Sequence, residues 1–458
     1  MSNKQDRETH VSEGRRRFMK DALAIGGGVL MSSLMSAEAV AAVAGAAKQY
    51  PKLGTYPAGS SGDRVFAGLV SPLTGAFSAT GADLKKGYDL AFEQLNAGAG
   101  IGAKWPSLAG KKGVLGKQVE WQVADCETNP NVAVQLATRF IHQRNAVMIG
   151  GGTASSTAVA LEKLAQSEKV IDMIGASGAN ATTGVDCQRY AFRPQVSAYM
   201  AGKALAPVLA KHLGKDRKAA YLVPDYNYGH SVASSTKRFT EAIGWKSVMT
   251  QVAPVGTTDY SSYLLNIANS GADVFVNVEF GNDSVASSQQ AEQFGLLKKM
   301  KLVVPNISPF QAKSSGANVV AGMYGTVSFW WTLADKNQFA RIFVDDFYKK
   351  YGYKPRWCAQ QAYMQTFLWA DAVSRAGTFY PPEVIKKLES GHKLMTSLGE
   401  VYYRAFDHQL VRAVPVVVGK KKADMKGPED YFEIIGLVPG EDVIPPTSET
   451  MCKMPAYT

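Results

Sequence analysis

The chain has 458 residues, a formal net charge of +11 and 46% hydrophobic side chains. Its length exceeds what one hydrophobic core normally serves, so we expect two domains. The lysines and arginines are scattered, apart from short runs at 111–112 and 420–422. Scattered charge is typical of a solvated surface and argues against nucleic-acid binding.

The N-terminal segment has the features of an export signal. Arg15, Arg16 and Arg17 precede an apolar run at 22–35, although Gly14 stands where Ser or Thr is usual. The run is too short to span a membrane comfortably, which takes about 20 apolar residues. We therefore predict a twin-arginine signal peptide over residues 1–39, with cleavage between 39 and 47. The mature chain is expected to be periplasmic and not inserted in the membrane.

From residue 63 onward, short β-branched runs alternate with segments of helical periodicity. The first series has predicted strands at 64–70, 118–124, 146–149 and 170–174, and helices at 82–96, 130–143 and 157–168. The second has helices at 198–213, 229–242, 262–269 and 283–294, and strands at 219–223, 248–252, 273–278 and 301–304. This alternation predicts an α/β protein with two lobes, each a mostly parallel sheet with helices on both faces. The alternative is a single long doubly wound sheet.

The last third of the chain is expected to complete both lobes. It contains predicted helices at 337–351 and 360–376 and a predicted strand pair within 401–418. We assign residues 62–194 and about 329–398 to an N-terminal lobe, and 195–328 and about 399–458 to a C-terminal lobe. Several crossings between lobes would form a hinge.

The four cysteines, Cys126, Cys187, Cys358 and Cys452, lie far apart and form no Cys-x-x-Cys pair. In an exported protein they permit two disulfides in three possible pairings. The sequence does not choose among them.

No pattern in the chain indicates catalysis. The six histidines form no His-Glu-x-x-His motif, and no Gly-x-Ser-x-Gly or Gly-x-x-x-x-Gly-Lys motif is present. The glycines at 150–152 follow a predicted strand, but their spacing is not that of a dinucleotide-binding loop. We expect no enzyme activity, no cofactor and no metal.

Small, hydroxyl-bearing and aromatic residues follow several predicted strands. Ser155 and Ser156 open one helix, a small-residue loop follows at 175–180, and Tyr226, Tyr228 and Phe280 follow strands of the second series. Helix N-termini at the carboxyl ends of parallel strands bind polar groups, and tyrosines add apolar surface and hydroxyls. The alternatives are that the serine caps the helix, that the tyrosines only pack, and that the acids near Phe280 only begin a helix.

Six motifs, at 68–75, 124–130, 149–157, 189–193, 225–229 and 359–372, are weak singly but specific in their order and spacing. They resemble the periplasmic binding proteins of branched-chain amino-acid, urea and amide type that serve ABC transporters. The resemblance covers residues 63–419 and implies a leucine-binding-protein-like, type I periplasmic binding fold.

The resemblance also implies a ligand site between the lobes. The polar head of the ligand would bind the loops at 153–156 and 177–180. Tyr226, Tyr228 and Phe280 of the opposing lobe would close over the ligand as an aromatic lid. The implied site residues are Phe77, Ala154, Ser155, Ser156, Ser177, Gly178, Ala179, Tyr226, Tyr228, Glu279, Phe280, Asn306 and Trp330.

Two positions depart from the family pattern. Amino-acid binders hold the ligand ammonium with an acid near Asn306, where this chain has none, unless Glu279 or Asp283 replaces it. Cys126 matches a family cysteine whose usual partner, near Thr153, is absent, so any disulfide is paired differently.

The resemblance implies a monomeric substrate-binding component of an ABC importer, with a small-molecule ligand and permease partners. The solute would be an amino acid, an amide, a urea-like compound or a carboxylate. The alternatives are a ligand-sensing receptor of the same fold and an exported amide hydrolase.

Overall fold

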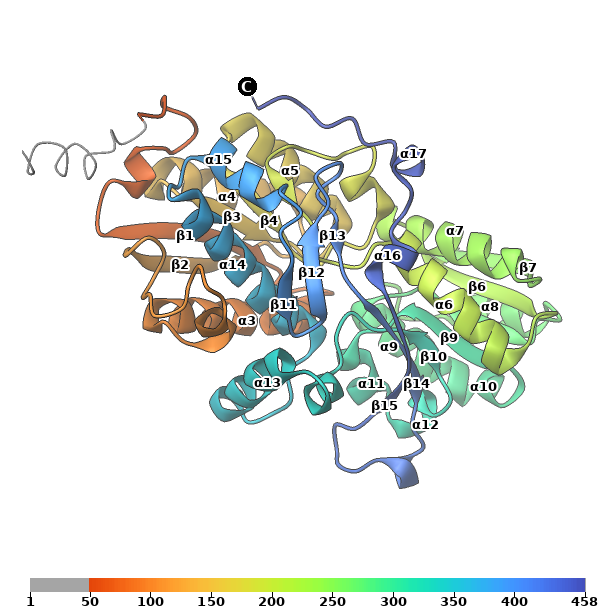
Figure 1. The fold of residues 1–458 in the computed structure, drawn as a ribbon. Helices are drawn as coiled ribbons and strands as arrows, with labels where there is room; N and C mark the ends of the chain where they lie inside the picture. Colours follow the sequence, from red (N-terminus) through yellow and green to blue (C-terminus); the bar gives the residue numbers. More distant parts are fainter. Residues whose placement is uncertain (1–48, 458) are drawn as a thin grey trace, which may run out of the picture. The chain divides into compact units, whose positions relative to one another are not determined.

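The structure is a computed structural model that describes residues 49–457. The predicted signal peptide lies outside these residues. A compact unit begins at Lys52 and holds all the helices and strands given below (Figure 1).

The first lobe is built on a five-stranded parallel sheet in the order β2-β1-β3-β4-β5. β1 is buried along its length after its first residue, as expected of a strand covered on both faces. The strands are β1 (Arg64–Ser71), β2 (Gln118–Asp125), β3 (Met148–Gly151), β4 (Ile171–Ile174) and β5 (Ala191–Phe192).

Two pairs of helices cover this sheet, with α14 packed on α3 and α4 packed on α5. Asn129 begins α4 by accepting hydrogen bonds from the backbone N–H groups of Asn131 and Val132. The helices of this lobe are α3 (Ser78–Ala97), α4 (Pro130–Arg144), α5 (Ser155–Glu168), α13 (Gln338–Tyr351), α14 (Trp357–Ala376) and α15 (Pro381–Leu388).

The second lobe contains a seven-stranded sheet in the order β7-β6-β8-β9-β10-β14-β15. Its first five strands are parallel, and β14 and β15 add to the edge as antiparallel strands. The strands are β6 (Lys218–Pro224), β7 (Lys246–Ala253), β8 (Val274–Asn277), β9 (Lys301–Asn306), β10 (Tyr324–Thr326), β14 (Val414–Gly419) and β15 (Phe432–Val438).

Helices α6 and α7 pack together on this sheet, and α9 packs with α11. The helices after β5 that belong to this lobe are α6 (Ala198–Leu213), α7 (Asn227–Ala242), α8 (Ser261–Ala268), α9 (Gly281–Gln293), α10 (Leu296–Lys299), α11 (Pro309–Ser315) and α12 (Ala317–Val320). The two-lobed α/β fold expected from the sequence is confirmed, and the alternative of one long sheet is wrong.

The chain crosses between the lobes after β5, after β10 and before β14. A small third sheet of β11 (Leu394–Thr396), β12 (Gly399–Tyr403) and β13 (Leu410–Val411) lies along the returning chain. The strand pair predicted within 401–418 is therefore divided. β12 pairs with β13, whereas β14 joins the second lobe.

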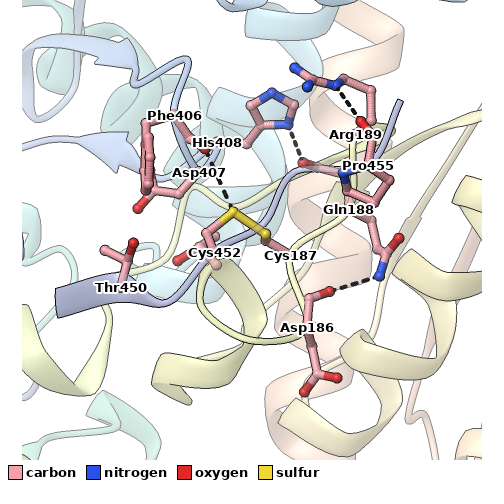
Figure 2. The surroundings of a disulfide bond; sticks show 12 residues. Asp186, Cys187, Gln188, Arg189, Phe406, Asp407, His408, Thr450, Cys452 and Pro455 are labelled. Carbon is pink, nitrogen blue, oxygen red and sulfur yellow. Dashed lines mark hydrogen bonds between the residues drawn. A yellow bond between two sulfur atoms is a disulfide. The ribbon is translucent and has the colours of Figure 1, made fainter. Parts of the chain in front are cut away.

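The C-terminal segment follows β15, contains the short helices α16 (Gly440–Val443) and α17 (Thr447–Thr450), and is fixed by a disulfide between Cys452 and Cys187 (Figure 2). Beyond the disulfide, the carbonyl of Pro455 accepts a hydrogen bond from Arg189 Nε at 3.0 Å. Cys126 and Cys358 are free and buried. One disulfide thus forms, and it joins the second cysteine of the chain to the fourth.

Candidate functional site

In each sheet the chain first adds a strand on one side of the first strand and then adds the following strands on the other side. The order of strands therefore reverses at one point, and this point is equivalent in the two lobes. In the first sheet β1 and β3 are neighbours, and the chain leaves them for α3 and α5. In the second sheet β6 and β8 are neighbours, and the chain leaves them for α7 and α9. A crevice opens at such a reversal, outside the carboxyl ends of the strands, and it is where ligands of open α/β sheets bind.

In the first lobe, the loops at this point are shaped by buried hydrogen bonds. The hydroxyl of Ser155, at the start of α5, accepts a hydrogen bond from the backbone N–H of Ala179 at 3.1 Å. Ser177 shares a hydrogen bond of 2.8 Å with Thr182. The first bond joins the start of α5, after β3, to the loop after β4, and the second lies within the loop after β4.

A glycine is required at the end of β3. Gly151 has φ of +106°, and a Cβ there would lie 1.9 Å from the carbonyl oxygen of Val70. The close approach of β1 and β3 leaves no room for a side chain at this residue. The positive φ, which glycine adopts readily, lets the backbone turn out of the sheet toward α5.

In the second lobe, aromatic residues begin the two helices. Tyr226 precedes the first residue of α7, Tyr228 lies in its first turn, and Phe280 precedes α9. Tyr228 is hydrogen-bonded to Asn306 at the end of β9. The rings of Tyr228 and Phe280 are 5.5 Å apart between centroids.

The two lobes meet at these residues. Phe77, which precedes α3 in the first lobe, lies 5.6 Å from Phe280 in an edge-to-face arrangement and 6.4 Å from Tyr226. Phe280 also lies 6.3 Å from Trp357 at the start of α14. We call Phe77, Tyr226, Tyr228, Phe280 and Trp357 the aromatic cluster.

Small residues allow this contact. A Cβ on Gly178 would lie 3.0 Å from the ring of Tyr228, and one on Gly281, where φ is +62°, would lie 2.8 Å from the ring of Phe77. Nearby, Asn180 Nδ2 donates to Ser235 Oγ of α7 at 2.9 Å. The loops of one lobe therefore contact the helices of the other directly.

Glu279, which lies between β8 and Phe280, is a buried acid in this region. Only 1% of its surface is exposed, and neither carboxylate oxygen has a hydrogen-bond partner. Burial, and after it the nearby charge of Asp283, raises the pKa of Glu279 to about 9 from its usual 4.5. Burial also raises the pKa of Asp283, although the backbone N–H of Gly256 donates to that carboxylate.

Most of the site residues expected from the sequence come together here. Ala154 immediately precedes α5, Ser156 is half-buried in its first turn, and Ala179 is buried. Trp330 differs, because its ring packs against Phe432 at 5.1 Å and its Nε1 donates to the carbonyl of Phe432 at 3.1 Å. The structure thus places Trp330 against β15 and not in the aromatic cluster.

Sequence reasoning missed two residues. Trp357 is almost fully buried in the aromatic cluster, and Tyr260 has a buried hydroxyl without a hydrogen-bond partner. A tryptophan directly after Pro355 and Arg356, at the start of a long helix, was a signal that could have been read.

Within residues 49–457, no group of three or more His, Cys, Asp or Glu side chains is placed to hold a metal ion. No helix in that part of the chain has the length and apolar character needed to cross a membrane.

The sequence matches a family model described as periplasmic binding protein over residues 64–424. The chain belongs to this family, and membership implies a periplasmic protein that binds a ligand. The resemblance read from the motifs is confirmed.

Similar proteins and solved structures support membership of this family. Leu/Ile/Val-binding protein homolog 7 of Brucella suis biovar 1 is 29% identical over 310 residues, which cover 63% of this chain and 71% of the relative. The amino acid ABC transporter substrate-binding protein of Pseudomonas fluorescens Pf-5 has a TM-score of 0.76 and 26% identity, with 85% of this chain and 99% of that chain covered. A branched-chain amino acid ABC transporter periplasmic ligand-binding protein of Burkholderia xenovorans LB400 has a TM-score of 0.72 and 26% identity, with 85% and 99% covered.

Proposed function

We propose that the chain is the substrate-binding component of an ABC importer, and that it captures a small polar or aromatic solute between its lobes. The observation that carries the proposal is that the reversal points of the two sheets face each other through Phe77 and Phe280. Two crevices that each suit a ligand thus form one site.

The hydrogen bonds made by the hydroxyls of Ser155 and Ser177 support a binding function rather than catalysis. Ser155 Oγ accepts from Ala179 N, and Ser177 is bonded to Thr182, so both hydroxyls shape loops. A nucleophile would need a neighbouring base to take its proton. We therefore propose that the protein is not an enzyme.

The names of the relatives support an amino acid or a related compound as the solute. The Pseudomonas protein is named for amino acid transport, and the Brucella relative for leucine, isoleucine and valine. An amide, a urea-like compound or a carboxylate stays within the proposal, because Asn306 stands where amino-acid binders have an acid.

The proposed cycle uses the crossings between lobes as a hinge. With residues 62–194 and 329–398 as one lobe, and 195–328 and 399–458 as the other, the aromatic cluster separates when the lobes open. Ligand groups that contact both lobes favour the closed state, because only that state offers both sets of contacts. A monomer, exported by the twin-arginine pathway, would then deliver the solute to its permease.

Thermal unfolding of the purified mature protein tests this function. The panel should contain amino acids, amides, urea, amines, and aliphatic and aromatic acids. A ligand at about 100 times its Kd should stabilise the folded protein by about 2.7 kcal/mol. We expect one chemical class to raise the melting temperature.

Two variants locate the site. Tyr228→Ala and Ser155→Ala should keep the circular dichroism spectrum of the folded protein and bind the ligand at least tenfold more weakly. Tyr348→Ala, at an exposed tyrosine on α13, is the control and should bind normally. Full affinity in both site variants would place the ligand elsewhere, and no stabilisation by any class would count against the transport function.

A further inference from the structure

The C-terminal segment after β15 passes from the second lobe to the first. Its helix α16 packs against α6, and Val443 in α16 is buried. Its helix α17 lies beside α7, where Glu449 forms an ion pair of 2.7 Å with Arg238. From there the segment runs over the first lobe to the C-terminus (Figure 1). It is therefore a further connection between the lobes, in addition to the crossings already described.

On the first lobe, the segment is held by one covalent bond and by hydrogen bonds. Cys452 is joined to Cys187, which precedes β5 (Figure 2). Beyond this disulfide, three backbone carbonyls of the segment accept hydrogen bonds from side chains of the first lobe: Pro455 from Arg189 at 3.0 Å, Ala456 from Gln166 at 3.1 Å and Tyr457 from Tyr190 at 2.8 Å. Only the disulfide is covalent, so it stays in place when the hydrogen bonds break.

The segment bridges the two lobes beside a cavity and does not fill the space between them. The cavity has a volume of about 310 Å³. It is lined by both lobes and by the segment, and its lining includes Asn180, Thr183, Tyr199, Ser235 and Thr450. Close packing, which resists relative motion inside a protein, is thus interrupted at this junction. The chain of the segment is what connects the lobes across it.

Little chain separates the two points of attachment. Glu449, which is paired with α7, and Cys452, which is joined to the first lobe, are three residues apart in the sequence. Three residues of extended chain span about 11 Å at most. The ion pair is partly exposed, and a pair of this kind contributes little by itself. The disulfide, however, keeps Glu449 near Arg238, so the pair re-forms as an intramolecular contact each time it breaks.

We propose that the C-terminal segment acts as a strap that limits how far the two lobes separate, and that the disulfide between Cys187 and Cys452 holds this strap. Wider opening has to pull the segment away from α7 and α6, because the disulfide does not release the first lobe. Without the disulfide, the segment leaves the first lobe together with the second lobe, and the lobes open further. The inference concerns the protein without ligand, so it does not depend on which solute binds.

Distances between two spin labels test this strap. Ala82→Cys in α3 and Gln293→Cys in α9 place one label at an exposed position in each lobe. Both helices begin at the aromatic cluster, where the lobes meet. Pulsed electron paramagnetic resonance gives the distribution of distances between the labels in the ligand-free protein. The same labelling without the two introduced cysteines gives the background from the buried Cys126 and Cys358.

Three proteins should carry this pair of labels. The first has the parent sequence. The second has Cys187→Ala and Cys452→Ala and ends at residue 452, so it lacks both the disulfide and the hydrogen bonds beyond it. The third is the matched control, which ends at residue 452 but keeps the disulfide. The circular dichroism spectrum and melting temperature of each are recorded, and the labelled samples are prepared well below the lowest melting temperature.

We expect the parent and the control to give the same distribution, and the protein without the disulfide to give a broader one that is shifted to longer distances. Equal distributions in all three would overturn the inference and leave the disulfide a role in stability alone. An equally large shift in the control would also overturn it, because the hydrogen bonds beyond the disulfide would then hold the lobes.

A fourth protein tests the length of the strap with the disulfide in place. Six Gly and Ser residues inserted between Met451 and Cys452 add about 20 Å of reach at most. We expect this insertion to shift the distances in the same direction as loss of the disulfide, and the result does not depend on whether the protein without the disulfide folds. Unchanged distances would show that the segment does not limit opening. Because no ligand is present, failure here leaves the proposed binding function untouched.

Discussion

At the scale of single residues, the burial of Glu279 makes the stability of the folded protein depend on pH. Its pKa in the folded protein is about 9, against a usual value of 4.5. Between these values the folded state binds more protons than the unfolded state, so the free energy of unfolding contributed by this group falls as pH rises. At pH 7 the loss amounts to about 3 kcal/mol.

The Glu279→Gln variant without ligand should therefore be more stable than the parent protein at pH 7 and should show no gain near pH 4. The measurement is urea unfolding of both proteins from pH 4 to 9, and the quantity compared is the difference between them, because buried Asp172 and Glu162 add pH dependence of their own. A variant less stable than the parent at pH 7 would mean that Glu279 is ionised and satisfied in the free protein.

The sequence could show that Glu279 follows a strand but not that its carboxylate is unpaired. An acid before a helix often stabilises the helix N-terminus, which was the simpler interpretation. The difference depends on how deeply the side chain is buried and on which groups surround it, and the tertiary fold sets both.

At the scale of the elements, the small residues at strand ends set how closely the lobes approach. Gly178, after β4, has the ring of Tyr228 where its side chain would lie. The loop is therefore fitted to the first turn of α7 in the other lobe.

Gly178→Val should hinder closure without unfolding either lobe. We expect the affinity for ligand to fall at least tenfold while the melting temperature of the free protein changes little, because the clash exists only where the lobes meet. Gly427→Val is the control, because a Cβ at this glycine would have no neighbouring atoms within 4 Å. Equal affinity of Gly178→Val and the control would show that the lobes do not approach this closely around the ligand.

The regular βα alternation made most helices and strands predictable. For example, the strand predicted at 118–124 is β2 at 118–125, and the helix predicted at 130–143 is α4 at 130–144. The later strands were harder, because β15 pairs only with β14 and β10 is three residues long. Their positions depend on tertiary pairing, which local periodicity does not encode.

The two tryptophans illustrate the same limit at the site. Trp330 lies between Phe329 and Trp331 in the sequence, and Trp357 lies between Arg356 and Cys358, and neither pair of neighbours says what the ring will contact. Only the path of the returning chain places Trp357 beside Phe280 and Trp330 beside Phe432.

At the scale of the whole molecule, the C-terminal segment connects both lobes. Glu449 of α17 forms an ion pair of 2.7 Å with Arg238 of α7, whereas Cys452 is joined to Cys187 beside β5 of the first lobe. Figure 2 shows that the disulfide lies beside the loop of Phe406, Asp407 and His408, which joins β12 to β13.

Loss of the disulfide should destabilise the molecule. Cys452→Ala and Cys187→Ala should each lower the free energy of unfolding by about 2 to 4 kcal/mol, and the double variant should lose no more than either single one. Denaturant unfolding without reductant measures this. Additive losses would mean that the two cysteines act independently.

The unreduced, denatured parent protein should expose two thiols, those of Cys126 and Cys358. In the native protein both should react slowly, because burial raises their pKa values, to about 11 for Cys126. Thiol titration before and after denaturation counts them.

The pairing of Cys187 with Cys452, at a sequence separation of 265, turns most of the polypeptide into a covalent ring. Everything from α6 to α17 lies inside it. A protease that cuts one exposed loop in this region would leave the two pieces joined, and they would migrate as one molecule until reductant was added. A nicked protein would thus keep its two pieces covalently linked.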